Sequence, residues 1–112
     1  MMELNRGDIC VINFNPAKGG EIGKLRPAII LSDKVDNEIL DTVIVIPLST
    51  VIESDTEPYR VYIPKREKLL ENSDACIYEI RSLSKVRIKE KIASLTNREL
   101  NTIQECLCQI VK

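Results

Sequence analysis

The sequence contains no histidine, no tryptophan and only one phenylalanine, Phe14. Without histidine, the chain cannot form a Ser–His–Asp triad, a His–Cys dyad or a histidine-bound metal centre. The shortage of large aromatic side chains predicts that stacking platforms for single-stranded bases are nearly absent. The formal net charge is only −1, which excludes a polycation that coats nucleic acid, so any anion site must be local.

Long apolar runs and a secretory leader are missing as well. The longest apolar stretch, 43–48, is far too short to cross a bilayer, and the charged segment 1–8 does not resemble a signal peptide. We therefore expect a cytoplasmic protein without membrane contact, a single domain over residues 1–112, and a modest core that a partner subunit would help to stabilise. The cysteines should be reduced, small apolar core residues; they are Cys10, Cys76, Cys106 and Cys108.

The apolar pattern predicts a series of short strands. They share β-branched or alternating apolar residues and lie at 9–14, 27–32, 42–48, 59–63, 75–80 and 84–91. Between them we expect a polar turn at 33–38 and one helical turn at 65–70. The segment 27–32 is nearly all apolar in its middle and should be buried on both faces, whereas Pro47 should end the pairing of its strand or place it at an edge.

The end of the chain predicts an amphipathic helix. Thr96 and Glu99 fit a capping box, and an apolar face follows at 3-4-3 spacing, formed by Leu100, Ile103, Leu107 and Ile110. No helices separate the predicted strands. We therefore predict a mainly β fold, a compact antiparallel β-barrel with a C-terminal α-helix, rather than a βαβ fold.

The junction of a glycine-rich loop, 15–24, with a buried strand is a candidate anion site. Arg26 lies at this junction, so the strand can hold its five-donor guanidinium group rigidly while the group faces solvent, which suits a phosphate. An ion pair between Arg26 and Glu21 that orders the loop is the alternative.

Two further features could contribute to such a site. Ser49 and Thr50 follow a buried strand, where hydroxyl groups donate to phosphate oxygens but also begin turns routinely. Glu79 and Arg81 are two residues apart and share one face of a strand, where they could form a structural ion pair. The basic run at 81–91 fits a solvated strand face as well as a patch that follows phosphates.

The order and spacing of these features resemble one known family over nearly the whole chain. The matching segments are Arg6-Gly7-Asp8-Ile9, Asn15-Pro16, Gly20-Glu21, Arg26-Pro27-Ala28-Ile29-Ile30-Leu31-Ser32, Ile46-Pro47-Leu48-Ser49 and Ile80-Arg81-Ser82. They look like the MazF/PemK/Kid family, the toxins of bacterial type II toxin–antitoxin pairs. The resemblance implies an SH3-like antiparallel β-barrel with a C-terminal helix, which works as a homodimer.

The resemblance also implies an activity: metal-independent, sequence-specific cleavage of single-stranded RNA, which stops translation and growth and is blocked by a cognate antitoxin protein. No cofactor is implied. The family's catalytic arginine corresponds to Arg26, its phosphate-contacting Thr or Ser to Ser49, and the acidic residue of its Gly-x-Glu loop to Glu21. Some members carry a further arginine and aspartate where this chain has Cys76 and Tyr78, so we assign no acid–base role to that segment.

A ribonuclease without a metal ion can use the 2′-hydroxyl of its substrate as the nucleophile, and DNA lacks that hydroxyl. The protein then supplies positioning, charge stabilisation and proton transfer. We expect Arg26 to stabilise the pentacoordinate phosphorane, Ser49 to orient a non-bridging oxygen, and Glu21 or a bound water to take the proton. The expected RNA-binding residues, in a groove at the dimer interface, are Lys18, Gly20, Lys24, Thr50, Glu79 and Arg81.

Two alternatives of other classes stay open at this point. The first is a non-enzymatic toxin like CcdB, which has the same barrel and poisons DNA gyrase through an aromatic and hydrophobic C-terminal end. Here the end, 107–112, has no tryptophan. The second is an inactive SH3-like interaction module, which would cause no growth arrest when expressed.

Overall fold

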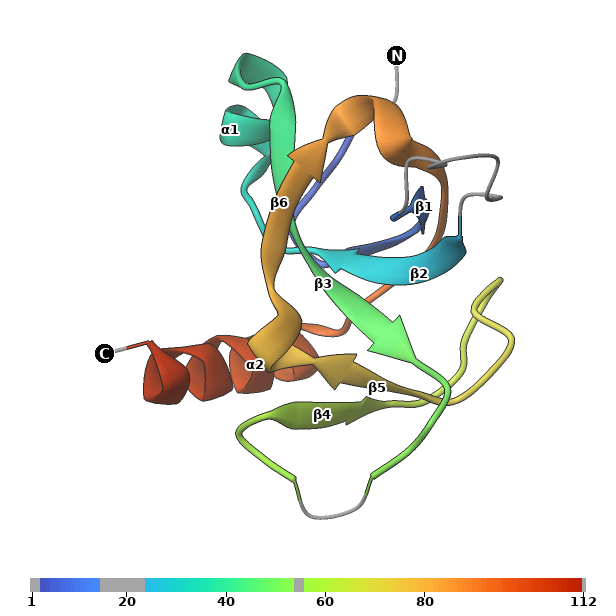
Figure 1. Ribbon diagram of the computed structural model, residues 1–112, viewed down its shortest axis with the longest axis vertical. Helices are drawn as coiled ribbons and strands as arrows, with labels where there is room; N and C mark the ends of the chain where they lie inside the picture. Colours follow the sequence, from blue (N-terminus) through green and yellow to red (C-terminus); the bar gives the residue numbers. More distant parts are fainter. Residues whose placement is uncertain (1–2, 15–23, 54–55, 112) are drawn as a thin grey trace, which may run out of the picture.

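Seven antiparallel strands and two α-helices make up most of the part of the chain that the computed structural model describes, residues 3–14, 24–53 and 56–111 (Figure 1). The strands are β1 (Asp8–Asn13), β2 (Leu25–Ile30), β3 (Thr42–Ser49), β4 (Arg60–Ile63), β5 (Ser73–Cys76), β6 (Arg81–Ser84) and β7 (Ile88–Ser94). The helices are α1 (Lys34–Ile39) and α2 (Asn97–Ile110), with short 3-10 helices η1 (Ile77–Glu79) and η2 (Lys85–Arg87).

The strands form one sheet in the order β4-β5-β3-β2-β1-β7, and β6 pairs with β3 beside this path. All of these pairings are antiparallel. The sheet is barrel-like but does not close, because no pairing within the described ranges joins β4 to β7. The predicted fold class, an antiparallel barrel with a C-terminal helix, is therefore confirmed in its broad form. No helix in those ranges is long and apolar enough to span a membrane.

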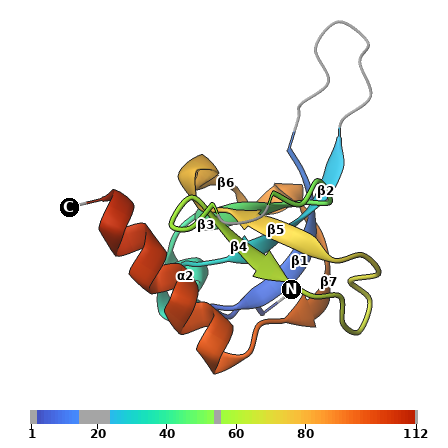
Figure 2. The same ribbon diagram turned by 90° about the horizontal axis from the view of Figure 1, so that it is seen from below.

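The core has two parts, because both faces of the central strands are buried. Ile29 of β2 belongs to a cluster that includes Ile103 and Cys106 of α2. Its neighbours Ala28 and Ile30 point to the opposite face and join a second cluster. The prediction that β2 is buried on both faces is confirmed. Figures 1 and 2 show α2 lying along one side of the strands, and it contacts β4 and η1 there.

Strand β3 changes its partner on one side near Pro47. Val45 pairs with Arg81 of β6, whereas Leu48 pairs with Ala75 of β5, and Pro47 lies between these two pairings. A proline has no backbone N–H to donate, so it is tolerated in this gap. The pairing with β6 thus ends before Pro47 as predicted, although β2 still pairs with it from the other side.

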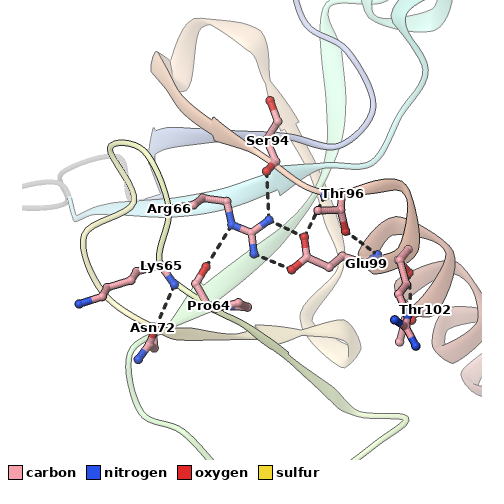
Figure 3. Close-up of polar contacts among 9 residues, drawn as sticks. Pro64, Lys65, Arg66, Asn72, Ser94, Thr96, Glu99 and Thr102 are labelled. Atoms are coloured by element: carbon pink, nitrogen blue, oxygen red, sulfur yellow. Dashed lines mark hydrogen bonds and ion pairs between the residues drawn. The ribbon is translucent and has the colours of Figure 1, made fainter.

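A polar network fixes the start of α2, where the predicted capping box is confirmed (Figure 3). Thr96 Oγ1 accepts a hydrogen bond of 3.1 Å from the Glu99 backbone N–H, and a Glu99 carboxylate oxygen accepts one of 2.8 Å from the Thr96 N–H. The guanidinium group of Arg66 donates to both oxygens of Glu99 and, at 3.2 Å, to the Ser94 carbonyl. This hydrogen bonding lowers the pKa of Glu99, against the opposing effect of burial.

Two local predictions are wrong because tertiary contacts decide these segments. The expected turn at 33–38 is helix α1, whose buried Asn37 donates to the carbonyls of Leu4 and Ser32. The expected helical turn at 65–70 is a tight turn in which the N–H groups of Arg66 and Leu69 each donate to the other's carbonyl. Leu69 is buried in the core, which holds this turn in place.

Two predicted strands are interrupted. The segment 75–80 leaves the sheet after Cys76 and forms η1, in which Ile77 is buried and the next two residues are exposed. The segment 84–91 contains η2 and then continues as β7, which pairs with β1. Both interruptions occur where the chain turns from one strand to the next. The strand propensity of individual residues does not indicate such turns.

Candidate functional site

Along one face of β2, the side chains change from apolar in the core to charged at the start of the strand. Along β2, Ile30 and Ala28 lie in the second core cluster, and Arg26 follows on the same face and is half-buried. The pairing of β2 with β3 ends at Ala28 and Pro47, and Arg26 and Ser49 each lie two residues beyond this end. Nη2 of Arg26 donates a hydrogen bond of 3.1 Å to the carbonyl of Leu48, which ties its guanidinium group to β3.

A pocket of about 270 Å³ lies at this end of the face. It is lined by Phe14, Lys24, Arg26, Pro47, Glu79 and Arg81. Four of the predicted site residues, the three cations and the carboxylate, therefore meet in one place although they come from distant parts of the chain. The three cations outnumber the one carboxylate, so the pocket attracts anions even though the whole chain carries a net charge of −1.

The ring of Phe14, a residue that was not predicted for the site, lies close to both arginines of the pocket. The Cζ atom of Arg26 lies 6.0 Å from the centroid of the Phe14 ring, and the Cζ atom of Arg81 lies 5.7 Å from it. Such distances allow cation–π attraction to both groups. The two positive groups also repel each other, and an anion between them would relieve that repulsion.

A sequence signal for Phe14 does exist in the strand register. Ile12 pairs with Arg26, and Phe14 lies two residues after Ile12, just past the end of β1, so the alternation of the strand predicts the same face for it. This inference can be made only when the pairing of β1 with β2 is known, and no single segment of the sequence indicates that pairing.

The two predicted hydroxyl residues do not line the pocket. Ser49 is half-buried at the end of β3, and its Oγ accepts a hydrogen bond of 3.2 Å from the Val51 N–H, so the turn interpretation applies to it. An accepting hydroxyl group keeps its own proton available for donation to a phosphate oxygen. Thr50 is exposed beyond the strand. Glu21, Lys18 and Gly20 lie outside the described residues.

The basic run at 81–91 does not form a continuous patch that follows phosphates. Lys85 donates to the Asn37 carbonyl at 2.6 Å, Arg87 donates to the Asn13 carbonyl at 3.2 Å, and Lys91 forms an ion pair with the buried Asp8 at 3.1 Å. Each of these cations is directed to a different structural contact. Arg81 is the member of the run that lines the pocket.

The cysteines support a structural role rather than nucleophilic chemistry. Cys10, Cys76 and Cys106 are buried, as predicted, whereas the prediction is wrong for Cys108, which is exposed. Burial raises the pKa of Cys10 to about 12 and raises the pKa of the other two buried thiols. Within the described ranges, no group of three or more cysteine, aspartate or glutamate residues is arranged to hold a metal ion.

Comparisons with known proteins agree with this arrangement. The family model described as PemK-like, MazF-like toxin of type II toxin-antitoxin system matches residues 5–111. A curated relative, Endoribonuclease MazF from Staphylococcus saprophyticus, is 30% identical over 105 residues, which cover 93% of this chain and 88% of the relative.

Two solved structures show the same fold. A MazE-MazF structure from Deinococcus radiodurans superposes with a TM-score of 0.83 at 22% identity and covers 99% of this chain and 97% of that chain. The Mycobacterium tuberculosis toxin MazF-mt6 gives a TM-score of 0.76 at 18% identity and covers 91% of this chain and 93% of that chain.

Proposed function

Because the chain belongs to the PemK-like, MazF-like family of toxins of type II toxin–antitoxin systems, we propose that it is a metal-independent endoribonuclease that cleaves single-stranded RNA at a specific sequence. The observation that carries this proposal is that Arg26 and Arg81 both approach the Phe14 ring in one pocket. Cleavage of mRNA in the cytoplasm would stop translation and growth.

The proposed reaction is an internal transesterification. The 2′-oxygen of the ribose attacks the adjacent phosphorus, and the bond from phosphorus to the 5′-oxygen of the next nucleotide breaks. The 2′-hydroxyl proton passes to a base, and the leaving 5′-oxygen takes up a proton. The products are a 2′,3′-cyclic phosphate and a 5′-hydroxyl group, and DNA is not cleaved because it lacks the nucleophile.

Arg26 is the residue that we place at the reacting phosphate. Its hydrogen bond to the Leu48 carbonyl fixes the guanidinium group through Nη2, and a guanidinium group has four further N–H donors that suit the oxygens of a phosphorane. A guanidinium group keeps its proton in proteins, so we assign Arg26 to charge stabilisation rather than to acid catalysis. Arg81, Lys24 and Glu79 hold the RNA on either side, because all three are exposed at the rim.

The remaining roles follow the family motif. Ser49 orients a non-bridging oxygen, with Thr50 beside it, and Glu21 or a bound water takes the proton from the 2′-hydroxyl. Lys18 and Gly20 of the same loop contact the RNA. These assignments rest on the match of the motif residues to the family.

The proposed partners follow from the relatives. Solved relatives include a MazE-MazF assembly and an endoribonuclease in complex with its cognate antitoxin. We accordingly propose that the chain binds a cognate antitoxin, and that residues 1–112 act as one domain in a homodimer with the RNA groove at its interface. The comparisons favour this function over a gyrase-binding toxin or an inactive interaction module, because the curated relative is named as an endoribonuclease.

A cleavage assay in EDTA tests the proposal. The wild-type protein should cut a long labelled transcript at defined positions in EDTA, and the products should carry the cyclic phosphate and the 5′-hydroxyl. An oligonucleotide with a single 2′-deoxyribose at the scissile position should resist cleavage. Activity that requires an added divalent metal ion, or cleavage of the deoxy substrate, would refute the mechanism.

The variant Arg26→Ala tests the central role of the arginine. It should remain folded and cleave about 10²–10³ times more slowly, since removal of one charge-stabilising donor has that effect in other enzymes. Arg98→Ala is the matched control, because Arg98 is an exposed arginine of α2 and lies outside the pocket. Near wild-type cleavage by Arg26→Ala would remove the basis of the assignment.

A further inference from the structure

Two of the three tyrosines form an exposed aromatic pair. The ring centroids of Tyr59 and Tyr78 lie 6.1 Å apart with an angle of 65° between the ring planes, an edge-to-face arrangement. The residues are 55% and 71% exposed. Composition alone did not indicate this pair, because its two members are 19 positions apart in the sequence.

The backbone holds this pair in a defined place. Tyr59 directly precedes β4, and its carbonyl accepts a hydrogen bond of 2.9 Å from the N–H of Ile77, the first residue of η1. Ile77 is fully buried in the core, and this packing holds η1 in place. Tyr78 follows it and faces solvent. The pair is thus fixed through the backbone, while most of its aromatic surface stays in water.

The pair adjoins the candidate site through η1, which lies between β5 and β6 (Figure 1). Glu79, the residue after Tyr78, lines the pocket together with Arg26 and Arg81. Successive residues of a 3-10 helix point about 120° apart, so Tyr78 points in a different direction from Glu79 and does not line the pocket. Neighbouring Cα atoms are only about 3.8 Å apart, which is less than the length of one nucleotide.

From this juxtaposition we propose that Tyr78 and Tyr59 form a stacking platform for a base next to the scissile linkage of the RNA, and that the platform contributes to the choice of cleavage site. The inference rests on the proposed function. A nucleobase is the occupant that the surroundings favour, because Tyr78 directly precedes Glu79, which lines the pocket with three cations. RNA-binding proteins commonly combine these two elements.

The experiment uses the full-length protein and a short RNA. Cleavage ends are first mapped on a long transcript, and a ten-nucleotide RNA around one site is then synthesised. In a second set of RNAs the base of each flanking nucleotide in turn is replaced by hydrogen. The values of kcat and KM are measured in EDTA for the wild type, Tyr78→Leu, Tyr59→Leu, Tyr78→Phe and Tyr62→Leu.

Tyr62→Leu is the matched control, because Tyr62 is a similarly exposed tyrosine of β4 that lines a different cavity. We expect KM to rise about tenfold in Tyr78→Leu, and less in Tyr59→Leu, while kcat changes less than twofold. Tyr78→Phe keeps the ring and should behave like the wild type. For the wild type, removal of one particular base from the RNA should raise KM about tenfold. For Tyr78→Leu, removal of the same base should not raise KM any further.

Three outcomes would overturn the inference. If Tyr78→Leu and Tyr59→Leu have the same kinetics as Tyr62→Leu, the tyrosine pair does not contact RNA. The pair would then be a surface for a protein partner. If KM rises in the tyrosine variants but the rise does not depend on any one base of the RNA, stacking on a base is not its cause. Absence of cleavage by the wild type would refute the proposed function as well, whereas the first two outcomes refute the platform alone.

Discussion

The guanidinium groups of Arg26 and Arg81 share one aromatic ring but differ in how firmly they are held. Arg26 is half-buried and bonded to the Leu48 carbonyl, whereas Arg81 is exposed on β6. A fixed donor can favour a transition state over bound substrate, because it does not have to be reorganised during the reaction. An exposed donor at the rim mainly increases binding. The two arginines should therefore affect different kinetic constants.

The variant Arg81→Ala tests this distinction. KM for the mapped RNA should rise about tenfold, while kcat should stay within threefold of the wild type, because removal of a contact made equally in substrate and transition state changes binding alone. Steady-state kinetics in EDTA at constant ionic strength give both constants. A fall in kcat as large as that of Arg26→Ala would contradict the assignment.

At this scale the sequence predicted the charged residues and missed the aromatic ones. Arg26, Glu79 and Arg81 follow recognisable motifs, so each could be identified from its neighbours along the chain. Phe14 and the pair of Tyr59 and Tyr78 acquire their positions only through strand pairing and through η1. Composition alone cannot show that scarce side chains are placed where they can act together.

Among the secondary-structure elements, α2 has the most strongly fixed start. The capping box is local, but Arg66 comes from a turn more than thirty residues earlier and bonds to the same carboxylate (Figure 3). The side chains of Arg66 and Glu99 are only 18% and 17% exposed, so water screens their attraction less than it would at the surface. This ion pair joins the turn after β4 to the helix that covers one core cluster.

Replacement of Glu99 by glutamine should reduce the free energy of unfolding by about 2 kcal/mol at pH 7, since hydrogen bonds to charged groups contribute about 1.5–3 kcal/mol. The pKa of Glu99 is lowered in the folded state from its usual value of 4.5, so the stabilisation is fully present above pH 4.5 and is lost as the pH falls through the folded-state value. Urea unfolding between pH 7 and pH 3 measures this. The difference between wild type and Glu99→Gln should shrink in acid.

The control is Glu105→Gln, which removes an exposed carboxylate from the same helix. It should change the free energy of unfolding by less than about 0.5 kcal/mol at every pH. A difference for Glu99→Gln that stays constant from pH 7 to pH 3 would show that the ionised carboxylate is not the source of the stabilisation.

The elements also show where prediction from sequence stops. The capping box of α2 is local and is confirmed, and three residues of its predicted apolar face, Ile103, Leu107 and Ile110, pack in one core cluster. Helix α1 and the turn at 66–69 depend on distant contacts instead, namely the bonds of the Asn37 side chain and the burial of Leu69. Local propensity could not anticipate either contact, because each partner lies on another part of the chain.

For the whole molecule, positive charge is locally concentrated although the net charge is close to zero. The net charge is −1, yet the pocket gathers three cations around one carboxylate. Binding of RNA should therefore depend on a small number of phosphate contacts and not on a general attraction. The same concentration explains why composition excluded a polycation without excluding a nucleic-acid site.

Binding of a non-cleavable 2′-deoxy analogue should weaken about 100-fold between 50 and 500 mM salt. Three phosphate contacts on a single strand give a slope of about −2 in the logarithm of the binding constant against the logarithm of salt concentration. Fluorescence anisotropy with a labelled oligonucleotide measures the slope directly. A flat dependence up to 500 mM would show that the three cations do not contact phosphates.

The two-sided core has a consequence for how relatives of this chain can diverge. The pocket grows out of the cluster that contains Phe14 and Ala28, whereas α2 packs on the cluster that contains Ile29 and Ile103. Leu48, whose carbonyl binds Arg26, and Ile77, which holds η1 in place, both belong to the cluster under α2. Mutations in either cluster therefore affect the candidate site, so relatives that repack the core for stability also change the geometry of that site.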